Sequence, residues 1–395
     1  MLSAESAATV RATLPVVAES MDDITGHFYG TMFADHPELL DGTFNRANQA
    51  NGEQRKALAG SIAAFAAMLL DNPGRRPDAL LSRIAHKHVS LGITDDQYVI
   101  VHKYLFGAIA HVLGEAATPD VVAAWDEVYW LMAGTLIAQE ARLYARSDVD
   151  EGDVWREWEV VGRNEDTADV ASFTLRPVGG GPVPPVRPGQ FVSVRTSMSD
   201  GVRQARQYSV SGGGDGRLRI TVKRVDEDGA PAGEMSTLLH TAVAPGDTLA
   251  LSLPAGDVTL ADGDHPVVLV SAGIGCTPMV AMLHHLAETA PDREVLVLHA
   301  DRSPGAHALR DETASLVDGL GNAGSVLWYE EDADGAGRPG RMNLAGVEVP
   351  AGAEVYLCGP LPFMRAVRAQ LAARGVPGDR IHYEVFGPDL WRGEE

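Results

Sequence analysis

The spacing of apolar residues changes twice along the 395-residue chain, and these changes constrain its fold more than any single motif does. Residues 1–146 carry apolar residues every three or four positions, which predicts a run of amphipathic helices. Residues 153–262 alternate apolar and polar positions in short runs separated by Gly, Pro and Asp, which predicts antiparallel strands in a barrel or a sandwich. In residues 264–395, short apolar strands alternate with helical segments, a pattern typical of a parallel α/β sheet.

The length agrees with a multidomain protein, because about 150 residues per domain is typical of folded chains. We therefore expect an all-α domain over residues 1–146, a β domain over residues 153–262 and an α/β domain over residues 264–395. The acidic, Gly-containing segment 147–153 is the expected link between the first two domains.

The composition excludes several classes of function. The formal net charge is −22, so the chain repels nucleic acid and anionic membranes. The longest apolar run, Ser61–Leu70, is about half of the ~20 residues that span a bilayer, so no integral membrane segment is expected. Residues 1–14 lack the basic region and apolar core of a signal peptide, and two cysteines are too few for a disulfide scaffold or a four-thiolate zinc site. We expect a cytoplasmic protein.

A glycine-containing turn, Gly273–Pro278, follows a predicted strand over residues 265–272 and precedes a predicted helix. Glycines let the backbone approach a pyrophosphate closely, and the N-terminus of the helix favours its negative charge. Pro278 replaces the third glycine of a dinucleotide fingerprint and suits the first helical position, where no N–H is needed. An ordinary strand-to-helix turn is the alternative interpretation.

Two further segments suit the same kind of ligand. In the β region, Arg206 can bind pyrophosphate, Tyr208 can lie on a ring and Ser209 can bind a ring nitrogen. On a straight strand Ser209 points away from the other two side chains. The segment Tyr356–Pro360 ends a predicted strand at the carboxyl edge, where ligands of open sheets bind. The ordinary alternatives are a surface Arg, a sheet Tyr and a buried thiol in a turn.

Two positions in the helical region carry polar groups among apolar neighbours. His86 and His88 lie about 200° apart on a helix, so one of them faces inward. The neighbours of His88 at helical spacing, such as Ile84 and Leu91, are apolar, which makes His88 the inward one. Glu140 lies on an apolar stripe, where an unpaired carboxylate is costly. A hydrogen-bonded core His and a solvated helix end are the alternatives; if the two side chains meet, they form a metal-ligand histidine and its orienting carboxylate.

In chain order, the R-x-Y-S, G-x-G-x-x-P and C-G-P motifs resemble those of the ferredoxin–NADP reductase superfamily, over about residues 153–395. The resemblance implies an antiparallel β-barrel that binds FAD and an α/β domain that binds NAD(P). For the flavin it implies Gln190, Phe191, Arg206, Gln207, Tyr208, Ser209, Gly233 and Ser236. For the nicotinamide dinucleotide it implies Gly273, Ile274, Gly275, Cys276, Thr277, Pro278, Cys358, Gly359 and Pro360. The C-terminal segment resembles the one that brings an aromatic ring and an acid to the flavin, namely Tyr383, Glu384, Val385, Phe386, Gly387 and Pro388.

Two details of this region remain open. Asp301 could bind a ribose hydroxyl of NADH, whereas the adjacent Arg302 could bind the 2′-phosphate of NADPH. Cys276 lies inside the dinucleotide turn, where it would make nicotinamide binding sensitive to thiol oxidation.

The helical region resembles a globin, and the whole chain resembles a flavohaemoglobin. The segment Phe44–Arg55 (FNRANQANGEQR) and the pair Lys87-His88 carry this resemblance. It implies haem b with His88 as the proximal iron ligand, Tyr98 and Glu140 as its charge-relay partners, and Lys87 as the neighbouring basic residue. On the distal side it implies Tyr29, Gln54 and Leu58, with Phe44 packed on the haem edge.

The family resemblance implies a nitric oxide dioxygenase in which electrons pass from NADH or NADPH through FAD to haem. Bound O2 then oxidises NO to nitrate, which detoxifies NO. Its expected partners are O2, NO and NAD(P)H, and we expect a monomer. The same residues permit a reductase of peroxides or of external acceptors, and an oxygen sensor or carrier with a built-in reductase.

Overall fold

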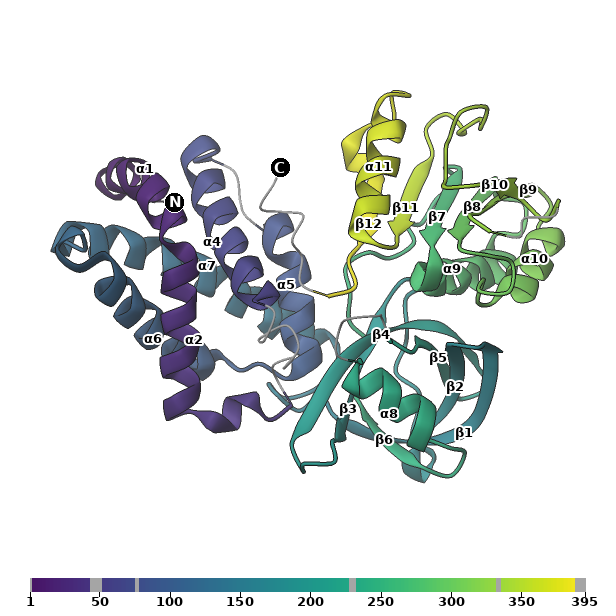
Figure 1. Cartoon of the computed structure of the whole chain (residues 1–395), viewed down its shortest axis with the longest axis horizontal. Coiled ribbons are helices and arrows are strands. Elements are labelled where there is room, and N and C mark those ends of the chain that lie inside the picture. The colour runs from purple at the N-terminus through teal and green to yellow at the C-terminus, as the bar shows by residue number, and fades with distance from the viewer. Residues whose placement is uncertain (1, 43–51, 75–77, 227–231, 332–334, 388–395) are drawn as a thin grey trace. The chain divides into compact units, whose positions relative to one another are not determined.

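The computed structural model describes residues 2–42, 52–74, 78–226, 232–331 and 335–387 (Figure 1). Its contacts form two compact units. One comprises the helical residues up to Trp155 together with Arg195–Ala205, and the other comprises Arg156–Val194 and Arg206–Gly387. The second unit contains most of a β-barrel and the whole of a parallel sheet, so the contacts between these two parts lie within one compact unit.

Several helices of the first unit begin at a capping residue, of which Thr118 is the one that the sequence predicts. Ser3 caps the first helix by accepting from the Ser6 backbone N–H, and Thr94 forms a reciprocal capping box with Gln97. Thr118 caps the last helix, which begins at Pro119, as its Thr-Pro-Asp sequence indicates. The elements are α1 (Ala4–Glu19), α2 (Met21–Asp35), η1 (Pro37–Leu40), α4 (Glu53–Asp71), α5 (Asp78–Leu91), α6 (Asp95–Leu113), η2 (Gly114–Ala116) and α7 (Pro119–Arg146).

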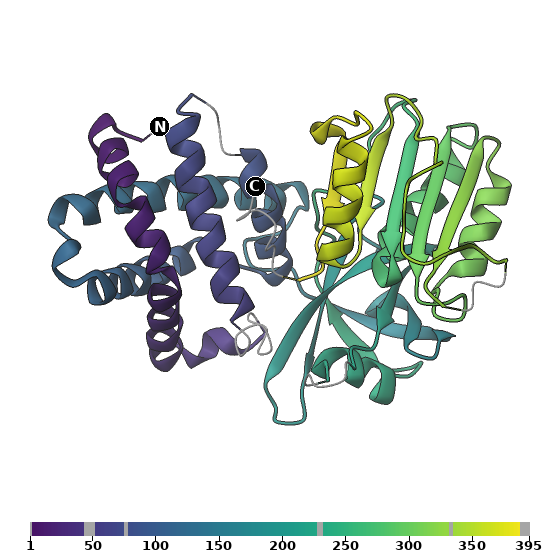
Figure 2. The ribbon, with the colours of Figure 1, turned by 45° about the horizontal axis from the view of Figure 1, so that its top comes forward.

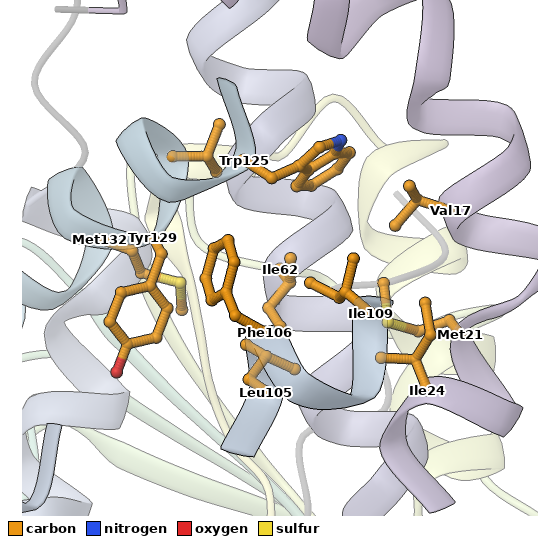
Figure 3. A pocket seen from close by; sticks show the side chains of 11 residues that line it. Val17, Met21, Ile24, Ile62, Leu105, Phe106, Ile109, Trp125, Tyr129 and Met132 are labelled. Carbon is orange, nitrogen blue, oxygen red and sulfur yellow. The ribbon is translucent and has the colours of Figure 1, made fainter. Parts of the chain in front are cut away.

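The apolar faces of these helices share one core, in which Ile24, Phe28 and Phe65 are almost fully buried. Between α1, α2, α4, α6 and α7 the core leaves an apolar cavity of about 30 Å³ (Figure 3). His88 and Tyr29 are not among the residues that line this cavity.

Helix α7 is the one helix among the described residues that is long and apolar enough to cross a membrane. This is weak evidence for a membrane span, because core helices of globular domains pass the same test. Residues along α7, such as Trp125 and Leu136, are buried in the core of the helical unit.

The β region closes into a six-stranded antiparallel barrel, which decides between the barrel and the sandwich. The strand order is β1-β2-β5-β4-β3-β6, and closure removes the exposed edges that a sandwich keeps. The strands are β1 (Arg156–Thr167), β2 (Val170–Pro177), β3 (Phe191–Ser197), β4 (Arg203–Gly214), β5 (Arg217–Lys223) and β6 (Thr248–Leu251). The short helix η3 (Val178–Gly180) follows β2, and α8 (Glu234–Ala242) lies between β5 and β6 in the chain.

The C-terminal region forms a six-stranded sheet in the order β10-β9-β8-β7-β11-β12, in which all pairs are parallel (Figure 2). The strands are β7 (Val267–Ala272), β8 (Val295–Asp301), β9 (Ala323–Tyr329), β10 (Arg338–Pro339), β11 (Glu354–Cys358) and β12 (Ile381–Glu384). The helical elements are η4 (Gly273–Gly275), α9 (Cys276–Thr289), α10 (Arg310–Gly319), α11 (Leu361–Ala372) and η5 (Gly378–Arg380). The predicted succession of an all-α region, an antiparallel barrel and a parallel α/β sheet is confirmed.

Candidate functional site

His88 of α5 and Glu140 of α7 meet inside the helical unit, which is the arrangement that the sequence indicates only as one of its alternatives. The Nδ1 atom of His88 lies 2.8 Å from Oε1 of Glu140 and 2.9 Å from the hydroxyl oxygen of Tyr98. The Tyr98 hydroxyl donates to the same carboxylate oxygen at 2.6 Å. Burial, followed by the charge of Glu140 and its hydrogen bond, raises the pKa of Tyr98 well above its ordinary value. Tyr98 therefore stays a protonated donor.

This arrangement orients the imidazole. The Glu140 side chain is 2% exposed and that of His88 is 30% exposed, so the carboxylate edge of the ring is buried while part of the ring stays accessible. With Nδ1 engaged by the carboxylate, Nε2 presents the lone pair that a metal requires. No cluster of three or more His, Cys, Asp or Glu side chains among the described residues is arranged to hold a bare metal ion. A haem iron fits, because it needs a single nitrogen ligand from the protein.

Of the residues expected on the distal side of the haem, the structure brings Tyr29 and Gln54 into contact. Tyr29 of α2 is buried and hydrogen-bonds to the side chain of Gln54 on α4. Burial raises the pKa of Tyr29 above its ordinary value, despite the opposing effect of that hydrogen bond. The Tyr29 ring stacks on Phe33 with ring centroids 5.5 Å apart, and Leu58 is half-buried against the same core. Phe44 lies outside the described residues.

Two tyrosines that support this site were not predicted to do so. Tyr129 donates to the backbone carbonyl of Tyr98 at 2.5 Å, and Tyr144 donates to the carbonyl of Ile93 at 2.7 Å. The Ile93 N–H donates in turn to the carbonyl of His88. In the sequence, the ring of Tyr144 fits the apolar stripe around Glu140. Only its hydroxyl group indicates that it also forms a hydrogen bond. Lys87, beside His88, is half-buried.

In the barrel, the R-x-Y-S segment lies in the middle of β4. Ser209 is buried, whereas Arg206, Gln207 and Tyr208 are half-buried. Burial raises the pKa of Tyr208 above its ordinary value, and the charge of Arg206 opposes this rise. Gln207 donates to the Ser193 hydroxyl at 3.0 Å, which ties the segment to β3. The pairing of β4 with β5 runs from Val210 to Gly214, just beyond the motif, and its register shifts between Val210 and Gly212.

Gln190 and Phe191 have structural roles next to β4. The side-chain oxygen of Gln190 accepts from the Arg187 N–H at 2.9 Å and thereby closes the Arg-Pro-Gly turn. The Gln190 carbonyl also accepts from the N–H of Val210, at 2.9 Å, while Phe191 bridges to Ala255. These contacts place both residues beside the R-x-Y-S strand.

Gly233 and Ser236 form a tight turn into α8. The Ser236 hydroxyl accepts from the Val225 N–H and donates to the Gly233 carbonyl, both at 3.1 Å. A Cβ on Gly233 would lie 2.7 Å from the Ser236 oxygen, so only glycine fits. Glycine thus lets the backbone turn directly into the N-terminus of α8, a favourable place for a phosphate.

The two nicotinamide motifs lie side by side at the carboxyl edge of the parallel sheet. Ser271 at the end of β7 pairs with Cys358 at the end of β11. A Cβ on Gly275 would lie 2.4 Å from the carbonyl oxygen of Cys358, so the glycine is required for this approach. Gly273 adopts φ +53°, a left-handed conformation that favours glycine. Of the remaining predicted residues, Ile274 is half-buried and Thr277 is buried. Pro278 is the third residue of α9 and not the first as expected, because the helix begins at Cys276. Pro360 is the N-cap residue of α11.

The expected redox sensitivity of Cys276 is wrong. Its side chain is buried against Val170 and Ala308, and the thiol lies 3.7 Å from the carbonyl oxygen of Ala308. Burial, reinforced by the charge of Asp301, raises the pKa of the Cys276 thiol to about 12. Oxidation proceeds through the thiolate, so this cysteine is inert.

Asp301 and Arg302 differ in their availability to a nucleotide. The Asp301 side chain is 4% exposed, and its Oδ1 accepts from the Arg302 N–H at 2.8 Å. Arg302 has a side chain that is 65% exposed and lies 3.6 Å from Asp169. Of the two, Arg302 presents its side chain to solvent.

The C-terminal segment continues the sheet beside the nicotinamide motifs. β12 pairs with β11 so that Glu384 is the register partner of Cys358. Glu384 is buried, whereas Val385 is half-buried and the ring of Phe386 is exposed. Gly387 adopts φ +120°, and Pro388 lies outside the described residues.

Each half of the chain matches a known protein family. The globin family matches residues 26–136, and the oxidoreductase NAD-binding domain family matches residues 269–369. A flavohemoprotein of Chromobacterium violaceum is 44% identical over 98% of each chain, and one of Bordetella parapertussis is 42% identical over 98% of this chain and 99% of its own.

The chain belongs to the flavohemoprotein family.

Solved structures agree with this assignment. The crystal structure of a flavohemoglobin from Malassezia yamatoensis, with bound FAD and heme, is 40% identical and superposes with a TM-score of 0.91 over 98% of this chain and 100% of its own. The FAD/NAD-binding domain of a nitric oxide dioxygenase from Vibrio cholerae is 39% identical and covers 59% of this flavohemoprotein and 99% of that chain, with a TM-score of 0.57.

Proposed function

We propose that this flavohemoprotein is an NAD(P)H-dependent nitric oxide dioxygenase that converts NO and O2 to nitrate. The observation that carries the proposal is the His88–Glu140–Tyr98 triad, with its buried carboxylate, in a globin fold whose chain continues into a reductase. Support comes from the Vibrio cholerae relative of the reductase region, which is a nitric oxide dioxygenase. Each NAD(P)H supplies two electrons, and the conversion of one NO with one O2 to nitrate consumes one.

His88 would hold haem, which supplies an iron centre that binds O2 and exchanges single electrons. Glu140 and Tyr98 keep the Nδ1 edge of His88 in a fixed orientation, and the carboxylate draws on the Nδ1 proton, at 2.8 Å. This makes His88 a stronger electron donor through Nε2. Tyr29 and Gln54 provide polar hydrogen atoms from a buried wall, where hydrogen bonds to developing negative charge are strongest.

FAD would be held by the R-x-Y-S strand and the turn before α8, where it accepts a hydride as an electron pair and releases electrons singly. Arg206 provides positive charge for the pyrophosphate, and Ser209 provides a buried hydroxyl. The turn Gly273–Gly275 and Cys358-Gly359 form the carboxyl edge that would take the nicotinamide dinucleotide. Glu384 lies at the same edge as the register partner of Cys358.

The remaining assignments follow from this function. O2 and NO are small neutral molecules, so the strong negative charge of the chain does not hinder their approach. NAD(P)H is an anion and requires the local positive charge of Arg302 and the start of α9. We assign the protein to the cytoplasm as a monomer, with domains over residues 1–146, 153–262 and 264–395.

The test is NO consumption by the chain loaded with haem and FAD, with NADH or NADPH, in air and under nitrogen. We expect O2-dependent removal of two NO molecules for each NAD(P)H oxidised, with nitrate as the product. NAD(P)H oxidation that is faster with hydroperoxide or cytochrome c than with NO would contradict the proposal and favour a reductase. Slow turnover in the presence of NO would indicate a sensor or carrier.

A further inference from the structure

Three charged or ionisable side chains join the barrel to the parallel sheet. Arg219 of β5 donates two parallel hydrogen bonds to Glu312 of α10, at 2.9 Å and 2.7 Å. The Nε2 atom of His284 on α9 lies 2.5 Å from the same carboxylate. The three residues therefore connect one barrel strand with two helices of the α/β region, all within one compact unit.

The barrel fixes the position of the Arg219 guanidinium from its other side. Its Nε donates to the Ser211 hydroxyl at 3.1 Å, and its Nη2 donates to the Ser211 carbonyl at 2.8 Å. A Cβ on Gly212 would lie 3.1 Å from Nη2, so this glycine leaves room for the guanidinium. The planar fork of Arg219 is thus held in place before it reaches Glu312, which limits the entropy lost in forming the contact.

Glu312 remains ionised in this environment. Burial alone would raise its pKa, but the hydrogen bonds from His284 and Arg219 outweigh burial and lower the pKa of Glu312 to about 2. The side chains of Arg219 and Glu312 are half-buried, at 22% and 26% exposed. A bidentate contact of this kind has a defined geometry, unlike an exposed ion pair.

A second, apolar contact joins the same regions at the start of α9. Val170, the first residue of β2, packs in a buried cluster with Cys276 and Ala308. Cys276 begins α9 directly after the dinucleotide turn, and His284 lies eight residues later, about 12 Å along the helix. The barrel therefore contacts α9 itself at its N-terminus, and reaches it again through Glu312 two turns further along.

We propose that Arg219, Glu312 and His284 form a positioning clamp that holds α9, with the dinucleotide turn at its N-terminus, against the flavin barrel. The proposal rests on the proposed function, in which a hydride leaves the nicotinamide ring with its electron pair and forms a bond to a flavin ring nitrogen. NAD(P)H is oxidised and FAD is reduced in this step. Misplacement by about 1 Å can slow such a transfer by about 100-fold, so the orientation of the two regions controls its rate.

The test is stopped-flow reduction of the flavin by NADH without oxygen, in the full chain loaded with FAD and haem. Glu312→Gln removes the charge that Arg219 binds, and Gly212→Ala crowds the guanidinium while keeping all three clamp side chains. Glu159→Gln is the matched control, because it removes one carboxylate from an exposed barrel ion pair with Arg176.

We expect Glu312→Gln and Gly212→Ala to lower the limiting reduction rate about tenfold or more, with less than a threefold change in the dissociation constant of NADH and unchanged flavin content. Glu159→Gln should match the unaltered chain. His284→Gln, which keeps an N–H donor for Glu312, should retain more of the rate than His284→Ala. The proposal would be overturned if the limiting reduction rate of Glu312→Gln stayed within twofold of that of the unaltered chain. It would also be overturned if the rate fell only in proportion to a loss of bound flavin.

Hydrogen exchange of the α9 amides separates the clamp from the proposed function. Faster exchange in Glu312→Gln than in Glu159→Gln is expected if the clamp holds this helix. If NADH reduces the flavin of the unaltered chain but the α9 amides exchange equally fast in Glu312→Gln and Glu159→Gln, the clamp is contradicted and the proposed function is not. An unaltered chain whose flavin accepts no electrons from NADH or NADPH would contradict the proposed function, and the hydride role of the clamp with it.

Discussion

Replacing Glu140 by Gln tests the central contact of the helical unit. The carboxylate accepts from Nδ1 of His88 at 2.8 Å and from the Tyr98 hydroxyl at 2.6 Å, and its side chain is almost fully buried. A hydrogen bond to a charged group contributes about 1.5–3 kcal/mol, against about 1 kcal/mol for a neutral pair. Glutamine keeps the shape and an acceptor oxygen but loses the charge, so we expect a loss of about 1–2 kcal/mol, or about tenfold in the local unfolding equilibrium.

Two measurements check this expectation in the haem-loaded chain. Resonance Raman spectroscopy should show a lower iron–histidine stretching frequency in Glu140→Gln, because His88 loses part of its anionic character. Urea unfolding followed by the Soret band should shift to lower urea concentration. Glu127→Gln is the matched control on the same helix, since Glu127 binds Ser3 at the surface. An unchanged stretching frequency in Glu140→Gln, with haem retained, would refute the assigned role of Glu140.

Three further outcomes are expected. Tyr29→Phe removes the hydroxyl that pairs with Gln54, so O2 should dissociate about tenfold faster in stopped flow and NO consumption should fall, while flavin reduction stays unchanged. Gly275→Ala places a methyl group 2.4 Å from the Cys358 carbonyl, so NADH should no longer reduce the flavin although the Soret band persists. Because the folded-state pKa of Glu312 is lowered from 4.5 to about 2, its stabilisation is complete above about pH 4.5 and is lost as the pH falls toward 2. The difference in urea midpoint between Glu312→Gln and the unaltered chain should therefore be large at pH 6 and small near pH 2.

The class of each region could be predicted from the sequence because side-chain periodicity is a local property of helices and strands. The choice between a barrel and a sandwich could not be predicted, because the strands of both alternate apolar and polar residues. Only the pairing of β1 with β6 shows that the sheet closes into a barrel. His88 and Glu140 were identifiable because a polar group on an apolar stripe needs a partner. The sequence did not predict that these two side chains meet, because their contact depends on how two helices pack.

Other features depend on tertiary contacts that no local pattern reveals. The inward orientation of Asp301 and the burial of Cys276 arise from neighbours distant in sequence. Arg219, Glu312 and His284 resemble solvated surface residues when each is considered on its own element. Their short distances appear only once the barrel and the sheet share one compact unit.

The burial of both cysteines, Cys276 and Cys358, has a consequence under the proposed function, in which NO is a substrate. S-nitrosylation, like oxidation to a sulfenic acid, favours accessible sulfur in its anionic form. Cys276 is closed off from solvent and holds its proton, and Cys358 has no exposed surface. Under the proposed function, NO would therefore meet no accessible thiolate at Cys276 or Cys358, the two cysteines of the nicotinamide edge.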